Sequence, residues 1–215
     1  LRARLDANSI PMVLHNLPAG DWAGGDRGIA CDQARQEEFR DGIARAIEYA
    51  QTLGVRQINC LTGKPGAGVP DAITRATLVD NLRHAAERLA QANLRLLLEP
   101  VNSRDVPGFW LDSVDKALSV VDEVSAPNLL LQFDIYHAQR SGGEIAGTLE
   151  RQFDRIGHIQ FADTPGRNEP GTGELNFGFL FDRIDQLGYQ GWVGAEYNPT
   201  TTTEAGLSWL ATYGD

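Results

Sequence analysis

Cysteine is scarce in this sequence: among its 215 residues, only Cys31 and Cys60 carry a thiol. The two do not form a CxxC motif, and their separation is not one that zinc ligands show. Neither a dithiol redox motif nor a structural zinc site is therefore indicated. We expect two reduced, inert thiols in a cytoplasmic protein, with a disulfide between them as the alternative.

Long apolar runs are also missing. No stretch approaches the roughly 20 apolar residues that a membrane-spanning helix needs, and the chain does not open on a signal-peptide pattern. These two absences argue against a membrane protein and against secretion. Residues 1–9 (LRARLDANS) resemble the last turns of an amphipathic helix, which predicts that further residues precede them in the natural protein.

Basic side chains are outnumbered. There are 19 Lys and Arg residues against 29 Asp and Glu residues, which gives a net charge of −10. Proteins that bind nucleic acid normally present a basic face to the phosphates, so we expect no nucleic-acid partner. An anionic small molecule would need local Lys, Arg or His side chains to overcome the long-range repulsion.

Apolar segments of strand length alternate with segments of helical periodicity along the whole chain. The predicted strands cover residues 11–15, 56–61, 94–99, 129–134, 158–162 and 192–196. The predicted helices cover residues 37–53, 71–92, 113–124, 143–155, 177–187 and 203–212, with Gly54 as the stop of the first helix and with Asp71 and Ser113 as the N-caps of the second and third. Continuous apolar strands that alternate with helices indicate a parallel sheet covered by helices.

Six β/α units that follow the end of a helix predict an α/β fold of the parallel (β/α)8 TIM-barrel type, with the first two units missing. Residues 1–215 would then form a single barrel domain that is incomplete at its N-terminus. A six-stranded doubly wound sheet is the alternative. The barrel is favoured because no glycine-rich phosphate fingerprint follows the first strand, and because the loops after the strands are long and rich in glycine.

Four of the predicted strands end on a polar side chain that can bind a metal: Glu99, Asp134, Gln160 and Glu196. All strands of a parallel barrel open their C-terminal ends on one face, so these groups would meet there. A carboxylate beside an apolar run is costly to bury unless it is paired or bound to a cation. Three carboxylates and an amide oxygen suit Mg²⁺ or Mn²⁺ better than Zn²⁺. For any one of them alone, an ion pair with a nearby cationic side chain is the competing interpretation.

Glu99 and Glu196 are also the natural acid–base pair. One carboxylate would remove a proton from carbon, and the other would return it to the neighbouring carbon. The metal and nearby hydrogen-bond donors would stabilise the enediolate oxygens formed between these steps.

Two further residues are expected to lie beneath the metal ligands. Side chains alternate along a strand, so Gln132 points to the same side as Asp134, and His158 to the same side as Gln160. This predicts that Gln132 and His158 orient the ligands from behind. For His158, an ordinary place in the core fits the pattern equally well.

Four residues are candidates for contacting the substrate. His137 follows Asp134 by three residues and is placed to hydrogen-bond a substrate oxygen, with loop packing as the alternative. Arg167, in the loop TPGRNEPGTG, is the best candidate to bind an anionic group, and Lys64 is the next; a solvated surface charge is the competing interpretation for both. His15, at the end of the first predicted strand, is expected to line the pocket.

Four stretches of the chain resemble the motifs of one known family: LLLEPVN, LQFDIYHAQR, GHIQFADTPGRNEPGTGELNF and GWVGAEYNP. They are similar to the hydroxypyruvate isomerase family, one of the xylose-isomerase-like barrels. The resemblance runs from about residue 10 to the end of the chain. It implies that Glu99 and Glu196 are acid–base residues that also ligate the metal, and that Asp134 and Gln160 complete the ligand set. Sugar epimerases of this superfamily typically have His where this chain has Gln160, which favours the hydroxypyruvate isomerase branch.

The expected activity is a metal-assisted aldose–ketose isomerisation that interconverts hydroxypyruvate and tartronate semialdehyde, acting on a small anionic keto or hydroxy acid. A 2-oxo-tetronate isomerase, or a related sugar-acid or ketose epimerase of the same fold, is the nearest alternative. An inactive barrel fragment is an alternative from another class. A DNA-repair endonuclease resembling endonuclease IV is disfavoured by the four histidines and the charge of −10. The sequence is compatible with a homo-oligomer.

Overall fold

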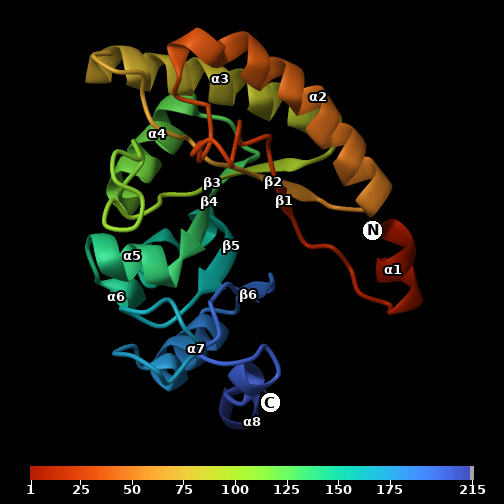
Figure 1. Cartoon of the computed structure of the whole chain (residues 1–215), viewed down its shortest axis with the longest axis vertical. Coiled ribbons are helices and arrows are strands. Elements are labelled where there is room, and N and C mark those ends of the chain that lie inside the picture. The colour runs from red at the N-terminus through yellow and green to blue at the C-terminus, as the bar shows by residue number, and fades with distance from the viewer. Residues whose placement is uncertain (214–215) are drawn as a thin grey trace. The chain divides into compact units, whose positions relative to one another are not determined.

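A computed structural model describes residues 1–213 of the chain. The chain forms two compact units, one from Leu1 to Leu131 and a second that begins at Gln132. The six strands are hydrogen-bonded in sequence order, from β1 to β6 (Figure 1). This sequential order is the one expected of successive β/α units, whereas the strand order of a doubly wound sheet reverses at a switch point. The prediction of a partial (β/α)8 barrel is confirmed over the doubly wound alternative.

The first unit contains β1 (His15–Asn16), β2 (Gln57–Cys60), β3 (Arg95–Leu98) and the start of β4 (Leu129–Asp134). Neighbouring strands pair in parallel, with Ile58 opposite Leu96 and Leu98 opposite Leu131. These four apolar side chains are fully buried. Asn59 and Leu97, which lie opposite each other, point to the other face and are fully buried as well. Both faces of the sheet are therefore covered in this unit, as a parallel sheet requires.

The helices of the first unit are α1 (Arg2–Ala7), α2 (Gln36–Leu53), α3 (Asp71–Gln91) and α4 (Val114–Val124), with the 3₁₀ turn η1 (Gln33–Arg35) before α2. Helix α3 lies beside both α2 and α4 (Figure 1). The end of α2 at Gly54 was predicted, and the φ angle of 72° there is one that glycine adopts without strain. Ser113 caps α4 as predicted, by accepting a hydrogen bond from the Lys116 amide.

The second unit contains the end of β4, β5 (Ile156–Phe161) and β6 (Val193–Ala195), with β5 and β6 parallel. Its helical elements are α5 (Ile135–Ser141), α6 (Ile145–Gln152), η2 (Phe153–Arg155), α7 (Phe177–Gln186), η3 (Ala205–Leu207) and α8 (Leu210–Tyr213). Phe161 on β5 makes edge-to-face contacts with Phe181 of α7 and with Trp209, at centroid distances of 5.2 and 5.3 Å. This aromatic cluster holds α7 and the C-terminal segment against β5.

Several predicted elements differ in extent. The first strand is only two residues long, because β2 begins at Gln57 and leaves almost no neighbouring strand for residues upstream of His15. The helix predicted over 203–212 is instead the turn η3 followed by the single turn α8. Here Gly206 is buried against Pro199, and its carbonyl accepts the Tyr197 hydroxyl, so tertiary contacts replace a continuous helix.

Two further features were not predicted correctly. The short helix α5 follows β4 directly, although no helix was expected there. Asp71 was expected to cap the N-terminus of its helix, but the helix begins at Asp71 and the capping position is Pro70. The Asp71 carboxylate instead accepts the indole N–H of Trp110 at 2.7 Å.

Among the described residues, the helices are all too short or too polar to span a bilayer.

Candidate active site

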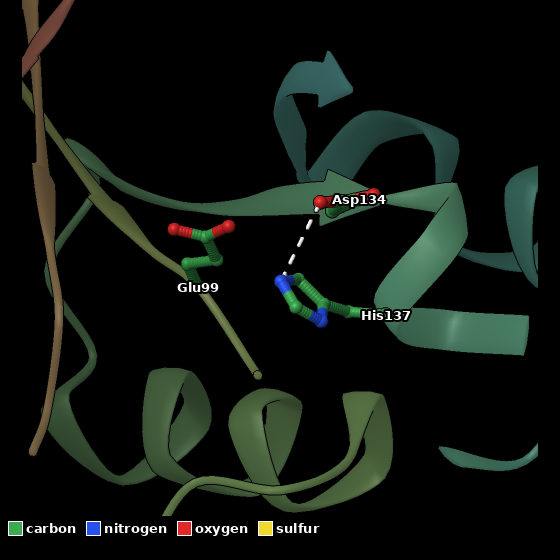
Figure 2. Close-up of side chains that lie close together, drawn as sticks. All are labelled: Glu99, Asp134 and His137. Carbon is green, nitrogen blue, oxygen red and sulfur yellow. Dashed lines mark ion pairs between the residues drawn. The ribbon is translucent and has the colours of Figure 1, made fainter. Parts of the chain in front are cut away.

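Asp134 is the last residue of β4 and also the N-cap of helix α5. Its Oδ1 accepts the backbone N–H of Tyr136 at 2.8 Å, which caps α5, and its side chain is almost fully buried. Its Oδ2 has no hydrogen-bond partner among residues 1–213, but lies 3.6 Å from Nε2 of His137 (Figure 2). Burial raises the pKa of Asp134 to about 6, although Arg167 and the backbone N–H groups of Tyr136 and His137 oppose that rise.

Arg167 lies between two carboxylates of the second unit. It comes from the loop between β5 and α7, and its Nη2 is 3.7 Å from Oδ2 of Asp134 and 3.4 Å from Oε2 of Glu196. Its guanidinium also lies over the ring of Tyr136, 5.1 Å from the centroid. The side chain is only about a quarter exposed, so the predicted alternative of a solvated surface charge does not describe it. Arg167 is a partly buried cation that faces two acids.

Glu196 receives a second polar contact from β5. Nε2 of Gln160 donates to Oε2 of Glu196 at 2.8 Å, and Oε1 of Gln160 accepts from Nε2 of Gln132 on β4. The carboxyl pKa of Glu196 is raised by burial; Asp134 acts in the same direction, while Arg167 and Gln160 act against it. About half of the Glu196 side chain remains exposed. The second unit therefore joins Gln132, Gln160 and Glu196 in one hydrogen-bonded row.

His158 lies behind this row. It is buried on β5, and a Cβ atom at Gly194 of β6 would lie 3.3 Å from its Nε2 and 3.6 Å from Cγ of Gln160. Glycine at position 194 thus leaves room for both side chains of β5. Burial lowers the pKa of His158 to about 4, so its imidazole is neutral at pH 7.

In the first unit, Glu99 directly follows β3 and is 5% exposed (Figure 2). Its Oε2 accepts from Nδ2 of Asn59 at 2.6 Å, and the same amide nitrogen donates to Oδ1 of Asn16 at 3.1 Å. Asn59 is fully buried on β2 and was not predicted. The signal that could have found it is an amide side chain between Ile58 and Cys60 in an otherwise apolar strand.

The other two predicted residues of the first unit have fewer partners. His15 is half-buried, and its Nδ1 lies 3.0 Å from the carbonyl oxygen of Asn16. Lys64 is exposed in the loop after β2, with its Cδ 3.7 Å from where a side chain at Gly108 would begin. Neither contact indicates a role, and both assignments stay predictions.

The second unit brings together five of the predicted site residues: Asp134, His137, Gln160, Arg167 and Glu196. Two of them are carboxylates whose pKa is raised, one is a cation, and one is a carboxamide that can offer oxygen. Asp134 presents a buried oxygen that no hydrogen bond satisfies within the described residues, which is a place where a cation would be stabilising. This donor set fits a hard divalent metal. It also fits the binding of a small anion by Arg167.

The family of the chain follows from its similarity to known proteins. The family model described as xylose isomerase-like TIM barrel matches residues 1–213. The chain belongs to this family, which agrees with its six sequentially ordered strands and with the resemblance seen in its motifs.

Two relatives by sequence and one solved structure are similar to this chain over nearly its whole length. Hydroxypyruvate isomerase of Escherichia coli is 53% identical over 99% of this chain and 83% of its own length. The 2-oxo-tetronate isomerase of Cupriavidus necator is 46% identical over 99% of this chain and 82% of its own. A crystal structure described as AP endonuclease, family 2, from Brucella melitensis has a TM-score of 0.95 at 39% identity, over 99% of this chain and 82% of that one. The prediction that the chain is an enzyme of the hydroxypyruvate isomerase type is confirmed.

Proposed function

We propose that this protein is a metal-assisted isomerase that interconverts hydroxypyruvate and tartronate semialdehyde. The observation that carries the proposal is the pair of carboxylates, Asp134 and Glu196, that face Arg167, with Gln160 hydrogen-bonded to Glu196. They lie in a chain that is 53% identical to the hydroxypyruvate isomerase of Escherichia coli. Acidic groups at the ends of parallel strands suit proton transfer, and a partly buried guanidinium suits the substrate carboxylate.

A divalent cation, Mg²⁺ or Mn²⁺, is the proposed cofactor. Asp134, Gln160 and Glu196 would hold it from the second unit, and Glu99 from the end of β3. Gln160 would first turn its amide, because its oxygen now accepts from Gln132. Such a cation supplies a Lewis acid that stabilises negative charge on the substrate oxygens. His137 is buried beside Asp134, with its Nε2 3.6 Å from Oδ2 of Asp134, so His137 is an alternative ligand.

The proton transfers are assigned to the two glutamates. One carboxylate takes a proton from C3 of hydroxypyruvate, and the other delivers a proton to C2, while the hydroxyl proton on O3 is passed to O2. Burial raises the pKa of Glu196, which favours its protonated form more than in an exposed glutamate. The second glutamate is Glu99, whose carboxylate is fixed by the hydrogen bond from Asn59.

Substrate binding is assigned to Arg167 and His137. Arg167 would pair with the substrate carboxylate through its guanidinium, for which a forked geometry is well suited. His137, 3.6 Å from Asp134, would donate to or accept from a substrate hydroxyl. Gln132 would support Gln160 from behind, and His158 would fill the space against β6 as a neutral imidazole.

The test is an isomerase assay with added Mg²⁺ or Mn²⁺ on the purified protein. Glu99→Gln and Glu196→Gln should each lose at least about a thousandfold in kcat, since each removes a proton-transfer group. Glu150→Gln, which changes a half-exposed carboxylate that pairs with Arg183, is the matched control and should stay active. Full activity in either active-site variant would refute the mechanism, and activity that survives complete metal removal would refute the cofactor.

A second substrate is supported by one finding. The 2-oxo-tetronate isomerase of Cupriavidus necator is 46% identical over nearly the whole chain. Measuring kcat/KM for hydroxypyruvate beside a 2-oxo-tetronate, under the same metal conditions, decides between the two. A DNA substrate is disfavoured by the net charge of −10, and nicking of abasic DNA by the purified protein would reverse that judgement.

A further inference from the structure

The loop that carries Arg167 is organised around one buried carboxylate. Asp163, 1% exposed, lies shortly after β5 and accepts hydrogen bonds from four backbone amides. Its Oδ1 accepts from Thr164 at 2.9 Å and Leu175 at 3.1 Å, and its Oδ2 accepts from Gly171 at 3.0 Å and Gly173 at 2.8 Å. The two oxygens thereby tie both ends of the loop to one point.

A carboxylate suits position 163 because it offers hydrogen-bond acceptors on both of its oxygens. All four partners are N–H donors, so an amide group in place of the carboxylate would direct its own N–H bonds at backbone donors. Hydrogen bonds to a carboxylate are also stronger than hydrogen bonds to a neutral acceptor. Gly173 fits the same arrangement, because a Cβ there would overlap the carbonyl oxygen of Thr164 and lie 2.6 Å from Oδ1 of Asp163.

The backbone on both sides of Arg167 is tied as well. The Asp163 amide donates to the Asn168 carbonyl at 2.8 Å, and the Asn198 amide donates to the Arg167 carbonyl at 2.8 Å. Arg167 itself has a φ angle of 55°, a left-handed conformation that a long side chain adopts only when its surroundings impose it. Asn198 lies two residues beyond Glu196, so this bond connects the Arg167 backbone to the chain that follows the glutamate.

We propose that Asp163 is a positioning residue that acts through Arg167. By holding the loop from within, it keeps the guanidinium within reach of the substrate carboxylate and so sets the affinity for anionic substrates. The inference rests on the proposed function insofar as Arg167 binds the substrate. Nothing in the reaction itself requires Asp163 to touch the substrate.

The kinetic test compares Asp163→Asn, Arg167→Met and the double variant. We expect Asp163→Asn to raise the KM for hydroxypyruvate about tenfold or more and to change kcat by less than about threefold. The reason is that the change weakens substrate binding and leaves the proton-transfer groups in place. The double variant should be no worse than Arg167→Met, because both changes remove the same contact. Asn176→Ala, which removes the cap of α7 just after the loop, should leave KM unchanged. An unchanged KM in Asp163→Asn, or additive losses in the double variant, would overturn the inference.

Two measurements keep the test independent of activity and of the folding of one variant. In the wild-type protein, amide hydrogen exchange should be slow at Gly171, Gly173 and Leu175, and rapid exchange at all three would overturn the inference. Binding of tartronate, an anionic analogue, is measured by calorimetry in the wild-type protein, in Arg167→Met, in Asp163→Asn and, should Asp163→Asn not fold, in Asp163→Ser, whose smaller side chain adds no steric overlap. We expect affinity losses that match that of Arg167→Met. Such losses in a protein without isomerase activity would refute the proposed function alone, whereas wild-type tartronate affinity in an active Asp163→Asn would refute the inference alone.

Discussion

Replacing Asn59 with alanine removes the amide that donates to Glu99 at 2.6 Å and to Asn16 at 3.1 Å. The first of these is a short bond to a carboxylate, worth about 1.5–3 kcal/mol, and the second is a neutral bond worth about 1 kcal/mol. The site is fully buried, so water does not readily replace the lost donor. We expect the free energy of unfolding to fall by about 2–4 kcal/mol and the Tm to fall by roughly 5–15 °C, at about 2–4 °C per kcal/mol for a chain of this size.

The same change should also lower kcat, because the hydrogen bond from Asn59 holds the Glu99 carboxylate in one orientation. If the lost bond stabilises the reactive orientation by about 1.4 kcal/mol or more, kcat falls at least about tenfold. Stability is measured by thermal melting and kcat by the isomerase assay, at a temperature where the variant is fully folded. A drop in kcat without a large change in KM is the expected pattern, because Asn59 acts on a proton-transfer group rather than on substrate binding.

Asn81→Ala is the matched control for this prediction. Asn81 is also a fully buried asparagine of the first unit, and its Nδ2 donates to the backbone carbonyl of Ala30 at 2.9 Å. Its loss should destabilise the fold but leave kcat per folded molecule unchanged. Equal kcat values for the Asn59→Ala and Asn81→Ala variants would show that the hydrogen bond to Glu99 is only structural, and the reasoning would be wrong.

Three other predictions address chemistry and stability elsewhere. Burial raises the pKa of Cys31 to about 12 and that of Cys60 further, so neither thiol should react with a disulfide reagent at pH 8 until the protein is unfolded; rapid labelling of the native protein would contradict this. Arg35 lowers the pKa of Asp26 through a hydrogen bond, so that pair stabilises the fold above the ordinary carboxyl pKa and the effect is lost as pH falls through the lowered value. Arg35→Met should therefore weaken the acid dependence of unfolding below about pH 4, and an unchanged acid limb would contradict it. EDTA treatment should abolish isomerase activity, and added Mg²⁺ or Mn²⁺ should restore it; metal-independent activity would count against the proposed cofactor.

Hydrophobic pattern was sufficient to predict the order of strands and helices, because buried strands and amphipathic helices leave a periodic record in the sequence. It failed where tertiary contacts decide the structure. Helix α5 is only seven residues long and starts on the capping side chain of Asp134, so its pattern was too short to recognise. The segment around Gly206 is shaped by Tyr197 rather than by its own helical propensity.

In the candidate site, too, residues marked by a local pattern were predicted, and residues defined by distant contacts were missed. Strand ends identified Asp134, Gln160 and Glu196, because position on a parallel strand determines which face a side chain reaches. Asn59 was missed because its partner Glu99 is 40 residues away, and no local spacing connects them. Asp163 was missed because it accepts hydrogen bonds from backbone amides. Every residue except proline has such an amide, so the sequence does not distinguish the partners of Asp163.

The two oxygens of Asp134 have separate tasks, since Oδ1 caps α5 while Oδ2 faces His137 and Arg167. Asparagine caps a helix about as well as aspartate does, but it carries no charge. An asparagine at position 134 would therefore separate the folding task from the electrostatic one. For efforts to retarget this scaffold to a different cation or to a neutral sugar, we expect position 134 to accept a change of charge without a change of backbone, as long as the new side chain still reaches the Tyr136 amide.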